Sequence, residues 1–310
     1  MSGIYLFISS IASVRIIQIW CCSVMKKLNC TVYKDPPIPK DAIVVNWGVG
    51  GGLWPYYLGI ARYIQEHYDL ENCVFVGHSA GVEPSYWLSM EINIDLVWEY
   101  YYIDFLEHVG GCHTKGLWNW TYYCNKCHMK FINDMKMNDY NPDRLLKLLN
   151  ERCFVAVSEL AWNWGVWSTL RPVYLGSYTS HQSAIKCMLA SYHIPFLTAP
   201  IMAPFQMIKV LSNTTKKIYL SKFIDPWLSE RDHGKNNKHP EGKTLNIWPN
   251  KWRKFPVSSS WVWSNIDYNR KLYKLGYDDA RSHEECFSIL RKRVVPGERA
   301  VVDDRQRKKR

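Results

Sequence analysis

Two short apolar runs, each followed by a glycine-rich turn and a helical pattern, constrain the fold of this chain more than any other feature. The first run covers residues 42–47 and leads into Gly48-Val-Gly-Gly-Gly52. Pro55 then stands where proline favours a first helical turn, and apolar residues recur at helical spacing as far as Tyr68. The pattern predicts a buried strand, a glycine turn and a helix.

The second run has the same organisation. The strand-like segment Cys73-Val-Phe-Val76 leads into Gly77-His-Ser-Ala-Gly81, and a helical pattern continues to residue 90. A G-x-S-x-G turn between a strand and a helix is the context of a nucleophile elbow, a strained turn that lifts the serine hydroxyl clear of the sheet. The hydroxyl then lies at the positive end of a helix. Ser79 is therefore the predicted nucleophile.

A serine that attacks an acyl group needs hydrogen-bond donors for the oxyanion that forms. Gly50, Gly51 and Gly52 follow the neighbouring strand and can offer backbone N–H groups with no side chain in the way. A dinucleotide-binding turn is the competing interpretation, but Leu53 occupies the position of its third glycine. A plain tight turn stays open as an alternative.

Two further stretches complete a family resemblance. Residues 189–195, Leu-Ala-Ser-Tyr-His-Ile-Pro, resemble an Ala-Ser-x-x-Ile-Pro motif, and residues 272–280 resemble a closing helix. Together with the triple glycine and the elbow, in this order, they make the chain from about residue 42 to about residue 280 resemble a patatin-like phospholipase. The resemblance implies an α/β fold of three α/β/α layers with a mostly parallel central sheet. We expect a single catalytic domain over residues 34–292.

The resemblance also implies a reaction. Family members use a Ser–Asp dyad, and Asp225 matches the family's aspartate. We therefore expect a lipid acyl hydrolase that cleaves carboxylic esters of glycerophospholipids or acylglycerols through an acyl-enzyme. Ser79 would attack, Asp225 would take its proton, and the triple glycine would hold the oxyanion. Neither a metal nor another cofactor is required.

Two departures from the family pattern support one of two alternative functions. Pro226 replaces the glycine expected after the aspartate, and Leu53-Trp-Pro55 replaces the usual Ile-Arg-Gly. These changes are consistent with a catalytically inactive protein that binds lipid or protein. The other alternative is a Ser-Asp-His esterase or lipase, with a histidine supplied by one of three positions, His233, His239 or His283.

Cysteine and histidine also cluster in the middle of the chain. Cys112-His113 and Cys124-Asn-Lys-Cys127-His128 can together supply four zinc ligands, and Cys-x-x-Cys-His also matches a covalent haem attachment site. A single Cys-x-x-Cys without a second pair is a poor zinc signal, and nothing else in the sequence suggests haem chemistry. The sequence therefore predicts neither group.

The two ends of the chain differ from its centre. Residues 293–310 form a basic tail, and the last twenty residues hold nine basic and three acidic side chains, more than half of the net charge of +11. The rest is too mildly basic for a nucleic-acid-binding face. Residues 1–33 form an apolar segment, with Arg15 as the only charge between residues 3 and 25. Its length is enough to span a bilayer, but the balance of apolar and polar residues is marginal for insertion, so an interfacial helix and a buried terminal helix stay open beside a span. The lysines that follow place the next domain at the cytoplasmic face if the segment spans, and we expect the protein at that face of a membrane or at a lipid surface.

Overall fold

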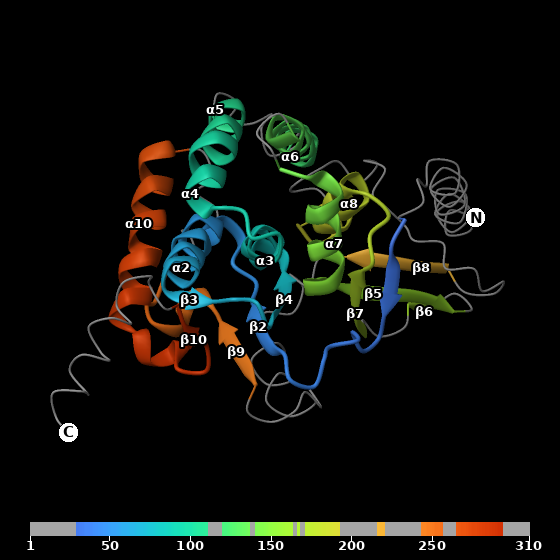
Figure 1. Ribbon diagram of the computed structural model, residues 1–310. Helices are drawn as coiled ribbons and strands as arrows, with labels where there is room; N and C mark the ends of the chain where they lie inside the picture. The colour runs from blue at the N-terminus through green and yellow to red at the C-terminus, as the bar shows by residue number, and fades with distance from the viewer. Residues whose placement is uncertain are drawn as a thin grey trace, which may run out of the picture.

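The computed structural model describes most of the chain. The described residues are 29–110, 120–136, 140–163, 166–167, 171–192, 216–220, 243–256 and 265–293. They form an α/β structure in which one large, mostly parallel sheet is accompanied by helices (Figure 1).

Six strands follow one another across the main path of the sheet. In spatial order they are β1 (Thr31–Tyr33), β7 (Arg171–Gly176), β5 (Cys153–Asn163), β4 (Cys73–His78), β2 (Ile43–Trp47) and β9 (Thr244–Ile247). The neighbours β5, β4, β2 and β9 are parallel, whereas β7 and β1 run antiparallel at one edge. Two shorter strands, β6 (Val166–Trp167) and β8 (Lys216–Leu220), pair with the far part of β5.

The pairing of β2 with β4 positions the two glycine turns. In this parallel register Trp47 lies opposite Gly77, so both turns leave the sheet at the same level. Both strands are apolar along almost their whole length, as expected where a parallel strand is covered on both faces. The two strand–turn–helix units predicted from the sequence are confirmed here.

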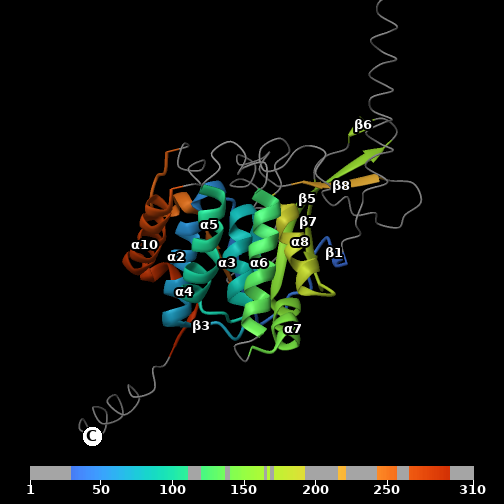
Figure 2. The ribbon, with the colours of Figure 1, turned by 90° about the horizontal axis from the view of Figure 1, so that it is seen from above.

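The helices occupy most of the remaining described chain. They are α2 (Trp54–His67), α3 (Val82–Ser89), α4 (Ile94–Leu96), α5 (Ile103–Gly110), α6 (Trp120–Lys136), α7 (Pro142–Arg152), α8 (His181–Tyr192) and α10 (Ile266–Ser282), with a π-helical stretch η3 (Val97–Tyr102) between α4 and α5. A view from above shows them side by side, and α10 contacts α2, α2 contacts α3, and α3 contacts α8 (Figure 2).

The core divides at the sheet. A large cluster on one face joins sheet residues such as Val45 and Phe75 to the helices. A smaller cluster on the other face contains Val44, Val76 and Phe154, and within the described ranges no helical residue belongs to it. Alternation of side chains along each strand produces this division.

The helix expected near the end of the chain is α10, and it packs closely on α2. A Cβ added at Gly59 would lie 1.9 Å from the carbonyl oxygen of Tyr273, and one added at Gly276 would lie 2.0 Å from that of Tyr56. The two helices therefore meet backbone to backbone, which only glycine at both positions allows.

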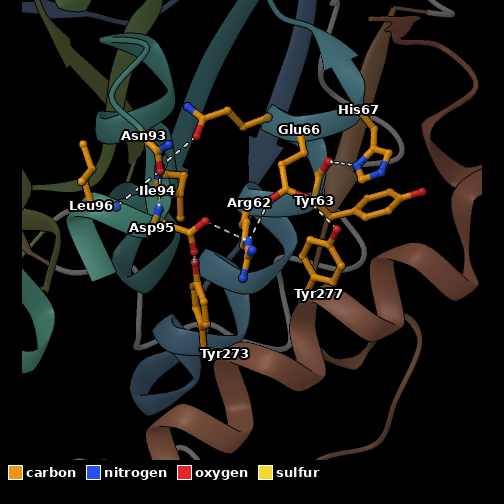
Figure 3. Close-up of polar contacts among 11 residues, drawn as sticks. Arg62, Tyr63, Glu66, His67, Asn93, Ile94, Asp95, Leu96, Tyr273 and Tyr277 are labelled. Atoms are coloured by element: carbon orange, nitrogen blue, oxygen red, sulfur yellow. Dashed lines mark hydrogen bonds and ion pairs between the residues drawn. The ribbon is translucent and has the colours of Figure 1, made fainter. Parts of the chain in front are cut away.

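Polar contacts extend this helix pairing to α4 (Figure 3). Arg62 of α2 forms ion pairs with Glu66, at 2.8 Å, and with Asp95 of α4, at 3.2 Å. From α10, the hydroxyl of Tyr273 donates to Asp95 and that of Tyr277 donates to Glu66. The closing helix is thereby joined to the helix that follows the triple glycine.

The amino-terminal part of the chain differs in one respect from expectation. Thr31–Tyr33, assigned from the sequence to the apolar terminal segment, is the edge strand β1 and pairs with β7. The sheet therefore begins before residues 34–40, which contain three prolines. No helix in the described part of the chain is long and apolar enough to cross a bilayer, and residues 1–28 lie outside that part.

Candidate active site

Ser79 has the backbone conformation of a strained turn. It follows β4 directly, opens the short 3-10 helix η2 (Ser79–Gly81) and has a φ of 51°. This left-handed conformation brings the Cβ of an L-residue close to its own backbone, at a cost of roughly 1–2 kcal/mol. Such a conformation persists only where the surrounding structure imposes it.

Both residues that flank this serine are glycines in close contact with neighbouring backbone. A Cβ at Gly77 would lie 2.5 Å from the Cα of Val82, so the strand and the start of α3 approach too closely for a side chain. A Cβ at Gly81 would lie 2.6 Å from the carbonyl oxygens of both Trp47 and Gly48. The G-x-S-x-G pattern thus reflects backbone contacts on both sides of the serine.

A second serine holds the backbone of the elbow in place. Ser191 of α8 is fully buried, and its hydroxyl accepts a hydrogen bond of 2.9 Å from the N–H of Ser79. The same hydroxyl donates to the carbonyl oxygen of Ala156 on β5, also at 2.9 Å. Ser191 is the serine of the Ala-Ser-x-x-Ile-Pro stretch, to which the sequence assigned no role. Its position joins that stretch to the elbow.

The triple glycine lies against the elbow. Gly51 has a φ of 53° and begins the 3-10 helix η1 (Gly51–Leu53). A Cβ at Gly50 would lie 3.4 Å from the Cβ of Ala80, the residue after Ser79. The first N–H groups of a helix have no partner within the helix and favour a negative charge. The turn therefore brings backbone donors next to the predicted nucleophile.

Trp54, one of the departures from the family pattern, packs against aromatic residues of the helical layer. It is the first residue of α2, is buried, and stacks on Tyr102 with ring centroids 4.5 Å apart. Pro55 follows in the first turn of α2, where its missing N–H costs no hydrogen bond. Both residues thus belong to the first turn of α2.

His78, next to the predicted nucleophile, belongs to a buried polar chain. Its Nε2 lies 3.1 Å from Oδ1 of Asn46, and the Asn46 amide nitrogen donates to Asn246 at 2.8 Å. The chain crosses three parallel strands, β4, β2 and β9. Because a buried amide needs its partners, this chain fixes the register of the strands beneath the elbow.

The proposed base of the dyad lies outside the described residues. Asp225, Pro226, His233 and His239 all fall in the range 221–242. His283 is described, at the end of α10, where its Nδ1 contacts the carbonyl oxygen of Asp279 at 2.8 Å and its ring stacks on Trp252. Among the described residues, no carboxylate or imidazole is hydrogen-bonded to the hydroxyl of Ser79. The identity of the base stays a prediction.

The structure places two of the cysteine and histidine residues that the sequence grouped in one buried cluster. Cys124 and His128 lie with Glu83 of α3 in a buried group whose ligand atoms are all within 4.8 Å of one another. Cys127 is not part of this cluster; burial, and then the carboxylate of Asp104 on α5, raise the pKa of its thiol to about 11. Cys112 and His113 lie outside the described residues. Among the members of the set that the structure describes, Cys124 and His128 lie in this cluster.

Comparisons with protein-family models, with curated proteins and with solved structures found no match to the chain.

The strain at Ser79 leads to a stability prediction. Ser79→Gly should be about 1 kcal/mol more stable than Ser79→Ala, because both lack the hydroxyl and only glycine adopts a φ of 51° without strain. Urea unfolding of the two variants measures the difference.

Ser177 provides the matched control, since it has the same φ of 51° in an exposed turn after β7. Its glycine and alanine variants should differ in the same direction. Equal stability of the two Ser79 variants, beside a clear difference at Ser177, would show that Ser79 is not held in the strained conformation.

Proposed function

We propose that the protein is a serine acyl hydrolase in which Ser79 is the nucleophile. The observation that carries the proposal is the left-handed conformation of Ser79 at a strand-to-helix turn, between two glycines that no other residue can replace. A strained serine of this kind is a feature of hydrolase elbows, and strain of this kind clusters at active sites. The adjoining glycine turn adds the donors that an acyl transfer needs.

The mechanism follows from these positions. The Ser79 hydroxyl loses its proton to a base, for which we propose Asp225, and attacks the ester carbonyl carbon. Backbone N–H groups at Gly50–Gly52 and at Ala80 stabilise the negative charge on the carbonyl oxygen. The protonated base then gives its proton to the leaving alkoxide, which departs as the alcohol. The same base, now free, takes a proton from a water molecule that attacks the acyl-enzyme, which releases the acid and restores the serine.

The substrate class comes from the family resemblance. Four motifs in order support a patatin-like fold of three α/β/α layers and a lipid ester as substrate, either a glycerophospholipid or an acylglycerol. Ser191 strengthens this proposal, because a residue from the third motif hydrogen-bonds to the residue at the centre of the second. The proposed location is a lipid surface or the cytoplasmic face of a membrane.

The first test is ester hydrolysis. Ser79→Ala should reduce turnover of a short-chain nitrophenyl ester by on the order of 10⁶, to the background rate, because no other group would form the acyl-enzyme. Ser177→Ala, which changes a serine of the same backbone conformation outside the site, should retain wild-type turnover. Substantial turnover by Ser79→Ala would remove Ser79 from the mechanism. An inactive wild type would favour the alternative of a lipid- or protein-binding protein.

A second test identifies the base. Asp225→Asn should lower turnover by several orders of magnitude, because the amide cannot take the serine proton. Single replacements of His233, His239 and His283 by Gln should each retain activity. A large loss at one histidine would instead favour a Ser-Asp-His triad.

The lipid surface can be tested with liposomes. Removing residues 1–28 should weaken sedimentation with anionic liposomes and leave hydrolysis of a soluble ester unchanged, because the described catalytic units begin after this segment. The wild-type chain should also sediment less with these liposomes in high salt, because salt screens the attraction between the basic tail and the anionic lipid. Loss of soluble-ester activity in the truncated chain would place the segment in the core.

A further inference from the structure

Two cysteines that are far apart in the chain have their thiols in contact at the edge of the fold. Cys30 directly precedes the edge strand β1, and Cys187 lies in the middle of α8. Both are free thiols, and their side chains are hydrogen-bonded to each other. Because more than 150 residues separate them in the sequence, the contact is produced by the tertiary fold.

Backbone contacts hold Cys30 beside α8. The carbonyl oxygen of Asn29 accepts a hydrogen bond of 2.8 Å from the hydroxyl of Ser183 and one of 3.1 Å from the backbone N–H of Thr179. Ser183 and Cys187 are four residues apart on α8 and therefore share one face of that helix. Directly after Cys30, β1 pairs with β7. Cys30 is thus fixed on both sides, by an anchored carbonyl and by a paired strand.

The two thiols differ in access and in acidity. Cys30 is partly exposed, whereas Cys187 is completely buried. The hydrogen bond from Cys187 lowers the pKa of the Cys30 thiol below its ordinary value, because it stabilises the thiolate. Burial raises the pKa of the Cys187 thiol well above its ordinary value. Cys30 is therefore the thiol that a soluble oxidant reaches and that reacts first.

We propose that Cys30 and Cys187 are a redox-sensitive pair that forms a reversible disulfide between the start of β1 and α8. Two cysteines can be bridged without movement of the backbone only where their side chains point toward each other, as they do in this contact. The proposal does not depend on the ester chemistry proposed for Ser79, because the disulfide would form between two residues outside that site.

The oxidant in this proposal is a small disulfide such as oxidised glutathione. The Cys30 thiolate attacks one of its sulfurs, which forms a mixed disulfide and releases the other half as a thiolate. The sulfur of Cys187 then attacks that of Cys30 and displaces the second half. The two protein thiols lose two electrons to the small disulfide, and their two protons go to the two released thiolates. Where thiols are normally kept reduced, the bond would form only when the glutathione pool becomes oxidised.

The bond would connect two parts of the molecule that have separate roles. Ser191, which accepts a hydrogen bond from the N–H of Ser79, follows Cys187 by four residues on α8. Cys30 comes directly after the apolar segment of residues 1–28. Oxidation would therefore attach the chain that follows this segment to the helix that supports the elbow. A closed loop of this length also restricts the unfolded chain, which stabilises the folded protein.

A third cysteine provides the matched control. Cys153, the first residue of β5, is also buried, and its thiol is near enough to Cys187 to interact with it electrostatically. Its own side-chain hydrogen bonds are with Ser89 and Tyr178. Replacement of Cys153 by alanine should therefore leave the proposed disulfide intact.

The experiment maps disulfides in the folded, full-length protein. The wild-type chain, Cys30→Ser and Cys153→Ala are incubated in oxidised or in reduced glutathione, free thiols are alkylated, and the chains are digested with trypsin without reduction. Cleavage after lysine and arginine leaves Cys30, Cys153 and Cys187 on separate peptides, 28–34, 153–186 and 187–209. We expect mass spectrometry to find peptide 28–34 joined to peptide 187–209 in oxidised wild type and in oxidised Cys153→Ala. Excess reduced glutathione should separate them.

Thermal unfolding provides the second readout. Oxidised wild type should unfold several degrees above reduced wild type, because the disulfide restricts the unfolded chain. Cys153→Ala should show the same difference between its oxidised and reduced forms, and Cys30→Ser should show none.

The wild-type digest decides the outcome without requiring any variant to fold. Unlinked, alkylated peptides 28–34 and 187–209 after oxidation of the folded chain would overturn the proposal. Peptide 187–209 joined to 153–186 would also overturn it, as would Cys30 that carries glutathione while Cys187 stays free. A link that forms only in urea would show that the native fold does not bring the two thiols together, and would overturn it as well.

Discussion

The close contact between two glycine turns at the end of the sheet is the constraint on which the rest of the site depends. Gly81 lies so near the carbonyl oxygens of Trp47 and Gly48 that no side chain fits between them. Because the turns belong to the paired strands β2 and β4, the contact fixes both at once. Ser79 takes its left-handed conformation within this contact, and the triple glycine comes to lie beside Ala80.

Other parts of the chain keep this arrangement rigid. Ser191 joins the N–H of Ser79 to β5, and the chain from His78 through Asn46 to Asn246 joins the three strands below it. On the helical side, α3 carries Glu83 into a buried polar group with His128. A strained residue needs such support, since strain of about 1–3 kcal/mol would otherwise be relieved by movement of the turn. The elbow is supported from the sheet and from the helices.

Local patterns explain how much of this could be predicted from the sequence. The units around residues 42–67 and 73–89 were predictable because a strand, its turn and its helix are adjacent in the chain. The edge strand β1 and the pairing of β9 with β2 were not, because β1 is only three residues long and β9 is separated from β2 by about two hundred residues. Such pairing depends on tertiary contacts.

The site was predictable to a similar extent. Ser79 and the triple glycine could be identified because their motifs are local, whereas Ser191 acts through one hydrogen bond across 112 residues. The buried contact between Glu83 and His128 could not be predicted, because the two residues are more than forty positions apart in the chain. The one local sign of this contact is a carboxylate, Glu83, within a helix whose residues are all buried. Asp225 lies outside the described residues and stays a prediction from the resemblance.

The most direct measurement is covalent labelling of the wild-type protein with a fluorophosphonate, followed by mass spectrometry of its peptides. The probe reacts with a serine only where a base and oxyanion donors activate the hydroxyl. The elbow described above predicts one adduct per chain, on the peptide that contains Ser79. An adduct on another serine, or an unlabelled folded protein, would contradict the assignment of Ser79 as an activated nucleophile.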